Sequence, residues 1–238
     1  MKINGFKIEI FEDVYKPSED TFLLYDSIIN NYEKSFEVGS GVGLITLKLA
    51  KKSNYVLASD ISFEATKNTL YNVKQNLLND KVDIVCGDCL SFLKNKIFFD
   101  LIVFNPPYLP SENFNKKIFD LSWCGGKRGF EITLKFLKEA KKHINEKGTI
   151  MIISSSYIIN EVLNIIKKMN LKYSIKREKK MFFEKIYVVE IKKRREIKNK
   201  HNIRSYHSSS SSSSGSSSSN SSSSSNSSSS NPSSSSIF

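Results

Sequence analysis

Continuous apolar runs alternate with amphipathic stretches along the first 191 residues of the chain. The apolar runs are bounded by Gly, Asn, Asp or Ser, and they predict strands at Ser35–Val38, Tyr55–Ser59, Val82–Cys86, Leu101–Phe104 and Thr149–Ser154. The stretches between them predict helices at Gly43–Lys51, Phe63–Leu78, Phe130–His143 and, as a short one, near Leu90–Lys94. Buried strands that alternate with helices are typical of an α/β protein with a parallel sheet.

The two ends of this region carry other patterns. Residues 3–15 are mixed in character and predict an extended segment. Pro17-Ser18-Glu19-Asp20 then places acids in the first turn of a helix that ends near Asn30. The candidate apolar face of this helix is Phe22, Leu23, Ile28 and Ile29. At the far end, a helix near Ile158–Met169 precedes two segments that are close enough to pair as an antiparallel hairpin, Lys172–Arg177 and Ile186–Ile191.

The composition changes after residue 191. Lys192–Arg204 holds seven Lys or Arg against one Glu, and from Ser208 onward the chain is almost entirely serine. A serine run has nothing to bury and cannot offset the entropy cost of ordering, so we expect it to be disordered. The sequence therefore predicts a folded domain over residues 1–191, a basic linker over 192–207 and a disordered tail over 208–238.

The basic linker supplies about six of the formal net charge of +12, so the rest of the chain is only mildly positive. Contact of the linker with nucleic acid or the ribosome, a localisation signal and a solvated run of charge all fit this pattern. The solvated run is the simplest of the three, and nucleic-acid binding is not favoured.

Cysteine content and the lack of long apolar runs narrow the compartment. Cys86, Cys89 and Cys124 fit a reducing environment, because three cysteines cannot all pair and a chain this long needs no disulfide. Cys86-x-x-Cys89 has the spacing of a redox or zinc motif, but no second pair completes four ligands, so buried thiols and no metal are expected. No apolar run approaches the ~20 residues of a membrane span. We expect a soluble cytoplasmic protein, with the nucleus as an alternative.

The first candidate site is the turn Glu37-Val-Gly39-Ser-Gly41-Val-Gly43, between a predicted strand and a predicted helix. Glycines let the backbone turn tightly and approach a ligand, and the helix beyond presents unpaired N–H groups. Alone, the turn fits any nucleotide or a simple bend. Its spacing departs from the dinucleotide fingerprint, and the Glu37 carboxylate would repel a pyrophosphate, so a cationic ligand suits it better.

Acidic residues end the next two predicted strands. Asp60 can accept both hydroxyls of a ribose, or it can cap the helix that follows. Asp88 can accept a hydrogen bond from the exocyclic amine of a purine. Because ligands of open α/β sheets bind beyond the carboxyl ends of the strands, we expect one crevice to hold Glu37, Gly39, Asp60, Asp88 and Asn105.

The turn Asn105-Pro106-Pro107-Tyr108 follows a predicted strand. An amide or aromatic amine nitrogen is a poor nucleophile because its lone pair is delocalised, so its N–H groups must be held while the lone pair faces an electrophile. The Asn105 side-chain oxygen and the Pro106 carbonyl can accept those N–H groups, and Tyr108 can cover the planar group. A strand terminator is the simpler interpretation. The following stretch, Tyr108–Gly129, is long enough to be a substrate loop or lid.

These residues together resemble the class I S-adenosylmethionine-dependent methyltransferases. The likeness is to the HemK-like protein glutamine methyltransferases, in the short archaeal and eukaryotic branch that modifies class I translation release factors, and it covers Asp13 to Lys192. The choice within the class rests on Pro17-Ser-Glu-Asp-Thr21 and on Trp123-Cys-Gly-Gly-Lys-Arg-Gly129 with Glu131. The resemblance implies that residues 1–191 are the catalytic domain, with a Rossmann-like, mostly parallel seven-stranded sheet, helices on both faces and a C-terminal antiparallel hairpin.

The resemblance also implies roles and partners. S-adenosylmethionine is the expected co-substrate, bound by Thr21, Glu37, Gly39, Gly41, Asp60, Asp88, Cys89 (through its backbone) and Asn105. The expected acceptor is the glutamine amide of a Gly-Gly-Gln loop. The residues expected to hold it are Asn105, Pro106, Pro107 and Tyr108, of which Asn105, Pro106 and Tyr108 are the candidate catalytic residues. A small zinc-ribbon activator subunit that pairs with the sheet edge, forming a heterodimer, is also implied.

Other acceptors remain as alternatives. Adenine N6 or guanine N2 would need base flipping, usually with a target-reading domain or a large basic surface, whereas the dense basic cluster here lies in the linker. A protein lysine must first lose a proton and prefers a different pocket. A non-catalytic scaffold is a remote alternative, since the acceptor and cofactor positions are intact. The leading hypothesis is direct methyl transfer to an amide nitrogen, which needs no general base because the proton leaves afterwards.

Overall fold

The structure is a computed structural model that describes residues 1–94, 96–110 and 124–194. The tail and all but the first residues of the basic linker lie outside these ranges, as does most of the predicted substrate loop. The described residues form one compact unit.

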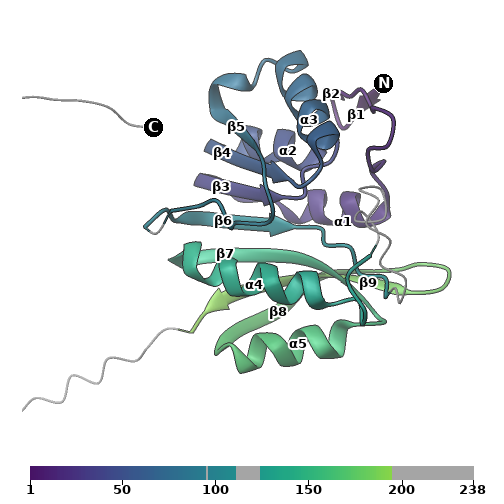
Figure 1. Cartoon of the computed structure of the whole chain (residues 1–238), viewed down its shortest axis with the longest axis vertical. Coiled ribbons are helices and arrows are strands. Elements are labelled where there is room, and N and C mark those ends of the chain that lie inside the picture. The colour runs from purple at the N-terminus through teal and green to yellow at the C-terminus, as the bar shows by residue number, and fades with distance from the viewer. Residues whose placement is uncertain (95, 111–123, 195–238) are drawn as a thin grey trace, which may run out of the picture. The chain divides into compact units, whose positions relative to one another are not determined.

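The described residues form one large sheet whose strand order is β5-β4-β3-β6-β7-β9-β8 (Figure 1). Its strands are β3 (Tyr32–Val38), β4 (Ser53–Asp60), β5 (Val82–Cys86), β6 (Phe99–Phe104), β7 (Ile144–Ser155), β8 (Leu171–Lys180) and β9 (Lys185–Lys193). Neighbours from β5 to β7 run parallel, while β9 runs antiparallel to both β7 and β8. The predicted seven-stranded, mostly parallel sheet with its C-terminal hairpin is confirmed.

Helices cover both faces of the sheet (Figure 1). One face packs against α1 (Glu19–Ser27), α2 (Leu44–Lys52) and α3 (Phe63–Gln75), and the other against α4 (Glu131–His143) and α5 (Ile159–Lys168). The strands are continuous apolar runs in the sequence because both faces of the sheet are buried, as the side chains of β6 show. Leu101 and Val103 point into the first core, and Ile102 and Phe104 point into the second.

Several predicted boundaries are wrong. Residues 89–92 form a turn rather than a helix, because Cys89 adopts a left-handed backbone (φ 51°) and the Leu90 N–H donates to Glu139 on α4 instead of starting a helical ladder. On α1, Ile29 is exposed and Leu24 is buried, since the helix ends at Ser27 and only Ile28 continues the inward face. Most strands are longer than predicted, and β9 extends to Lys193, so the first basic residues of the linker pair with β8.

An asparagine ladder on α3 holds the N-terminal segment, which also forms a small hairpin from β1 (Lys2–Ile3) and β2 (Phe6–Lys7). Asn68, Asn72 and Asn76 project from successive turns of α3. Their side-chain oxygens accept from the backbone N–H groups of Phe11 (2.9 Å), Glu9 (2.8 Å) and Lys7 (3.0 Å). Their amide nitrogens donate back to the carbonyls of Glu9 and Lys7. The ladder satisfies backbone groups of Lys7, Glu9 and Phe11 and holds the N-terminal segment against α3.

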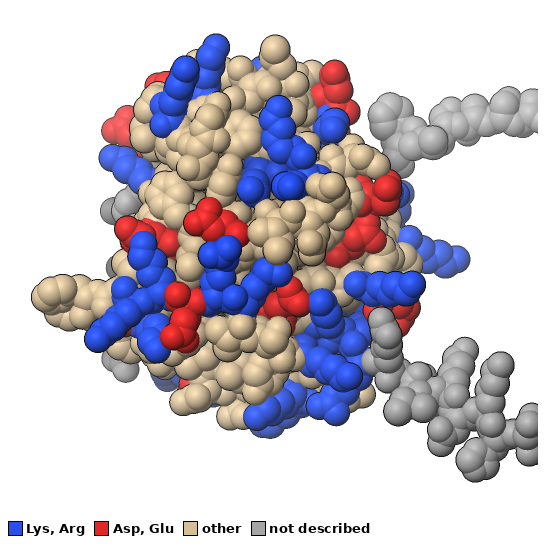
Figure 2. All heavy atoms as spheres, turned by 180° about the vertical axis from the view of Figure 1, so that it is seen from behind, with Lys and Arg blue, Asp and Glu red and all other residues tan. Residues whose placement is uncertain are grey.

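The surface agrees with the mild charge predicted for the body. In Figure 2, Lys and Arg side chains are interspersed with Asp and Glu over the face seen from behind. Within the described ranges, no helix is both long and apolar enough to span a bilayer. Cys89 and Cys124 are buried, as predicted, but Cys86 is exposed because β5 lies at the edge of the sheet.

Candidate active site

A cavity of about 510 Å³ lies at the carboxyl ends of the parallel strands. All the residues that the sequence assigned to the co-substrate or the acceptor line it, namely Thr21, Glu37, Gly39, Gly41, Asp60, Asp88, Cys89, Asn105, Pro106, Pro107 and Tyr108. These residues come from the start of α1, from the ends of β3, β4, β5 and β6, and from the loops that follow them. The fold thus brings together residues that are widely separated in the sequence.

The glycine turn after β3 supplies the floor of the cavity. Gly39 has a φ of +70°, and a Cβ there would lie 3.0 Å from the Phe104 ring, so a side chain would be strained and would push against the second core. Glu37 at the end of β3 is buried, and its carboxylate accepts a hydrogen bond from Thr46 on α2. Burial raises the pKa of Glu37 well above its ordinary value, against the opposing effect of the Thr46 bond. A cationic ligand would favour the ionised form.

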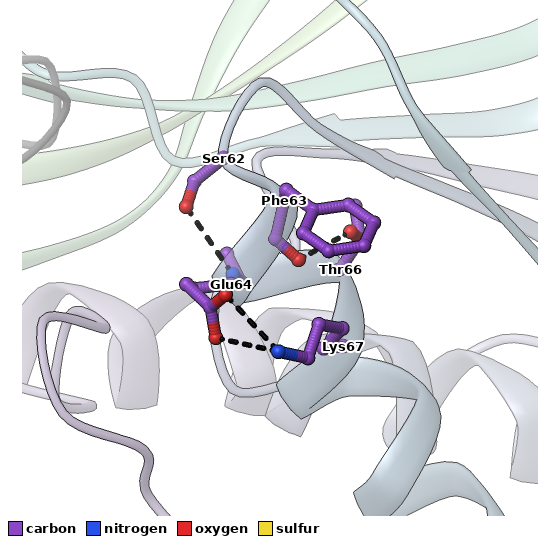
Figure 3. Close-up of polar contacts among 6 residues, drawn as sticks. Ser62, Phe63, Glu64, Thr66 and Lys67 are labelled. Atoms are coloured by element: carbon purple, nitrogen blue, oxygen red, sulfur yellow. Dashed lines mark hydrogen bonds and ion pairs between the residues drawn. The ribbon is translucent and has the colours of Figure 1, made fainter.

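Asp60 ties the glycine turn to the start of α3. Its carboxylate accepts from the Gly41 N–H and from the Ser62 N–H, both at 2.9 Å. Figure 3 shows the helix start itself, where the Ser62 hydroxyl accepts from the Ala65 N–H at 3.3 Å. Ser62, not Asp60, is therefore the N-cap of α3. Burial raises the pKa of Asp60, and the bond from Gly41 is the largest effect opposing it.

The region after β5 contains a partner that the sequence did not reveal. Asp88 forms an ion pair with Lys135 of α4, and Lys135 also lines the cavity. The Cys89 carbonyl accepts from the Ser59 hydroxyl at 3.3 Å, which holds this turn against β4. Burial raises the pKa of the Cys89 thiol to about 12, so it stays protonated and uncharged at neutral pH. The Cys89 side chain is buried, and the residue lines the cavity next to Asp88.

The acceptor side of the cavity is built around Asn105. The Asn105 amide nitrogen donates to Asp20 at 3.0 Å, and Asp20 also accepts from the Tyr15 hydroxyl at 3.1 Å. A carboxylate can only accept hydrogen bonds when ionised, so this contact fixes which way the amide faces. The Asn105 side-chain oxygen is buried and has no hydrogen-bond partner among the described residues. A buried acceptor without a donor costs free energy, so a donor is expected to fill this position.

Tyr108 closes the same side with help from the C-terminal hairpin. Glu184, which lies between β8 and β9, lines the cavity close to Tyr108. Burial raises the pKa of Tyr108 above its ordinary value, and the nearby carboxylates of Asp20 and Glu184 add to the shift. Burial likewise raises the pKa of Glu184, and its interaction with Tyr108 opposes that shift. The phenol is neutral and can lie against a planar amide.

The glycine-rich segment before α4 supports the turn from outside the cavity. The Gly125 N–H donates to the Leu109 carbonyl at 2.9 Å. A Cβ on Gly125 would lie 2.6 Å from the Pro107 carbonyl oxygen, so only glycine allows this approach. Residues 124–129 therefore buttress the Asn-Pro-Pro-Tyr backbone, and their role is positioning.

The sequence pattern did not identify four polar residues that line the cavity: Tyr15, Asp20, Lys135 and Glu184. Asp20 belongs to the Pro17–Thr21 segment, but the sequence pattern predicts only a helix start for it. Tyr15, Lys135 and Glu184 carried no local signal, because each reaches the cavity only through tertiary packing. No group of three or more His, Cys, Asp or Glu suited to a metal ion occurs in the part of the chain that the structure describes.

Known proteins are similar to this chain in sequence and in fold. The family model of the methyltransferase small domain matches residues 18–187. A Methanocaldococcus jannaschii protein assigned as a protein N5-glutamine methyltransferase is 32% identical over 200 residues, 79% of this chain and 96% of the relative. Methyltransferase HEMK2 of Mus musculus is 33% identical over 158 residues, 60% of this chain and 72% of the relative. The release factor glutamine methyltransferase of Dictyoglomus turgidum is 34% identical over 178 residues, but the match covers only 63% of that enzyme and 68% of this chain.

Solved structures agree on the architecture. Mtq2 of E. cuniculi, in its complex with Trm112, superposes with a TM-score of 0.60 at 23% identity, covering 76% of this chain and 99% of that one. A methyltransferase of Pyrococcus furiosus has a TM-score of 0.60 at 19% identity, covering 80% and 91%. Both are similarities of fold. With a family model over residues 18–187 and a relative matched over 96% of its length, the chain belongs to the methyltransferase small domain family, as an S-adenosylmethionine-dependent N-methyltransferase of the HemK-like group.

Proposed function

We propose that the chain methylates the side-chain amide nitrogen (N5) of the glutamine in the Gly-Gly-Gln loop of a class I translation release factor. One observation carries this proposal. The Asn105 side-chain oxygen is a buried acceptor without a partner among the described residues, and Asp20 fixes its direction. A primary amide offers two N–H donors in one plane, one for Asn105 and one for the Pro106 carbonyl.

The donor side of the cavity fits S-adenosylmethionine. The co-substrate supplies a methyl group on a positively charged sulfur. The buried Glu37 carboxylate favours a cation, Asp60 lies where a ribose can be bound, and Asp88 and Cys89 line the same cavity. Thr21 lies in the first turn of α1 and lines the cavity, so its side chain is placed to contact the co-substrate.

The residues present would act by positioning. With both N–H groups held, the amide lone pair faces the methyl group, the new N–C bond forms as the C–S bond breaks, and the amide proton leaves to solvent after transfer. Positioning of this kind can supply about 7–11 kcal/mol of the barrier. Tyr108 covers the amide plane and limits its rotation. No side chain need act as a general base.

The relatives support the choice of acceptor. The names of the M. jannaschii and D. turgidum relatives both specify glutamine, and the second specifies a release factor. The E. cuniculi complex is described as methylating the eRF1 termination factor. A nucleic-acid base usually needs a broad basic surface, and on the face seen in Figure 2 the Lys and Arg side chains are interspersed with acidic ones.

A small activator subunit, of zinc-ribbon type, is also part of this proposal. The E. cuniculi neighbour was solved with a partner, Trm112. Here β5 is an edge strand whose outer side pairs with no other described strand, and an edge of this kind can accept a strand from another chain. Copurification with such a subunit should raise the melting temperature of the chain. A subunit that binds equally well after a proline is placed at Asp83 of β5 would contradict this choice of edge.

Methyl transfer from labelled S-adenosylmethionine tests the proposed acceptor. The chain, with and without the candidate subunit, should be offered a class I release factor, its Gln→Ala loop variant and unmethylated duplex DNA. We expect label on the release factor alone. Label on the DNA, or label that survives the Gln→Ala change, would overturn the proposal.

A further inference from the structure

Two exposed aromatic side chains stand at the end of the β8–β9 hairpin. Phe182 and Phe183 are 91% and 84% exposed, and their rings contact each other edge to face at 4.6 Å between centroids. The hairpin extends beyond the sheet in Figure 1, and in Figure 2 its end is the tan projection at the left. Burying an aromatic side chain removes a large apolar area from water, so a pair left exposed is suited to a protein contact.

The end of the hairpin is anchored to the rest of the domain. The Met181 N–H donates to the Glu184 carbonyl at 2.7 Å, and this bond closes the turn that contains Phe182 and Phe183. The Tyr157 hydroxyl donates to the Phe183 carbonyl at 3.1 Å, from the loop between β7 and α5. Lys179 also forms an ion pair with Glu19 at the start of α1. The aromatic pair is therefore presented at a fixed place, which lowers the entropy cost of binding.

That place adjoins the acceptor side of the cavity. Glu184 directly follows Phe183, lines the cavity and interacts electrostatically with Tyr108 of the acceptor turn. Phe182 and Phe183 thus directly precede a residue that lines the acceptor side of the cavity. The strand order puts this hairpin at the end of the sheet opposite to β5, the edge proposed for the activator subunit.

We propose that Phe182 and Phe183 form a docking surface for the protein substrate, beside its acceptor loop. The inference rests on the proposed function and adds to it the means of recognition. The two rings would lie against an apolar patch on the folded substrate while the glutamine side chain enters the cavity. A folded protein can contact both the hairpin and the cavity, whereas a short peptide that contains only the acceptor loop reaches the cavity alone.

Steady-state kinetics of Phe182→Ser/Phe183→Ser test this surface. The substrates are the intact release factor and a short peptide of its Gly-Gly-Gln loop. We expect KM for the intact protein to rise about 10- to 100-fold, as is typical for loss of a central aromatic contact. The kinetics with the peptide and the affinity for S-adenosylmethionine should stay within about twofold of wild type, because neither involves the hairpin end.

Two controls make the result specific. Ile29→Ser removes another exposed apolar side chain (57% exposed), which precedes β3 at the opposite end of the parallel strands, and it should leave KM unchanged. Phe182→Leu/Phe183→Leu should restore part of the affinity. An unchanged KM in the double serine variant overturns the docking surface, as does an equal loss with the short peptide. A wild-type enzyme that does not methylate the release factor overturns the proposed function first, and this substrate with it.

Discussion

The donor side and the acceptor side of the cavity are built differently. On the donor side, Glu37 and Asp60 end neighbouring strands, and their carboxylates already have partners in Thr46, Gly41 and Ser62. On the acceptor side, Asn105 is oriented by a residue 85 positions away in the sequence, and its side-chain oxygen has no partner among the described residues. The donor-side carboxylates thus have partners without a ligand. In the proposed function, the acceptor amide pairs with the Asn105 oxygen, and the acceptor side determines specificity.

Of the variants considered, Asn105→Ala on the acceptor side should lower kcat the most. Loss of a positioned hydrogen-bonding group in an active site typically lowers kcat by about 10²–10³-fold. Because the donor side is complete without Asn105, the affinity for S-adenosylmethionine should change much less than kcat. Single-turnover transfer to the release factor and calorimetric titration of the co-substrate separate the two quantities. Equal losses in both would show that the two sides are not independent.

Glu37→Gln should damage the donor side instead. A hydrogen bond to a charged group contributes about 1.5–3 kcal/mol, so the affinity for S-adenosylmethionine should fall about 10- to 100-fold. The wild-type affinity should increase as pH rises through the raised pKa of Glu37, because the ionised form binds a cation, and the variant should lack this increase. Titrations of both proteins over a broad pH range measure both effects.

The same pKa shift makes a prediction for stability. A carboxyl group whose pKa is raised by folding stabilises the folded chain below its ordinary pKa, and this contribution is lost as pH rises through the raised pKa. At neutral pH, Glu37→Gln should therefore raise the melting temperature of the chain without ligand, even though it weakens binding. A lower melting temperature for the variant would contradict the claim that burying the Glu37 carboxylate destabilises the folded chain at neutral pH.

The asparagine ladder allows a matched pair of variants. Asn72 is buried and bonds Glu9 and Val42, whereas Asn76 bonds Lys7 at an exposed position. Leaving buried backbone groups unpaired costs about 1–3 kcal/mol each, so Asn72→Ala should destabilise the fold by at least that much, and Asn76→Ala by about 0.5–1.5 kcal/mol. Denaturant unfolding measures both. Equal effects would mean that burial of the ladder does not matter.

Lys67→Ala should have the smallest effect. Lys67 pairs with Glu64 at 3.1 Å on the exposed face of α3, close to Asp60 in sequence (Figure 3). Exposed helix pairs contribute about 0.3–0.5 kcal/mol. Both the free energy of unfolding and kcat should stay close to wild type. A large loss of co-substrate affinity would instead show that this turn of α3 contributes to the donor side.

The sequence predicted the donor side better than the acceptor side, for a physical reason. Glu37, Asp60 and Asp88 each follow an apolar strand, so local pattern and the rule that ligands bind beyond strand ends were sufficient to group them. Asp20 and Glu184 reach Asn105 and Tyr108 only after α1 and the hairpin pack on the sheet. The false helix after β5 has a similar origin, because a tertiary contact from Glu139 on α4 decides the path of that segment.

A double-mutant cycle on Asp20 and Asn105 tests the central claim most directly. The cycle compares kcat for release-factor methylation in Asp20→Asn, Asn105→Ala and the double variant, each saturated with S-adenosylmethionine. If Asp20 acts by fixing the Asn105 amide, Asp20→Asn lowers kcat alone but adds nothing once Asn105 is alanine. Losses that multiply in the double variant would contradict the account, because Asp20 would then act on the reaction independently of Asn105.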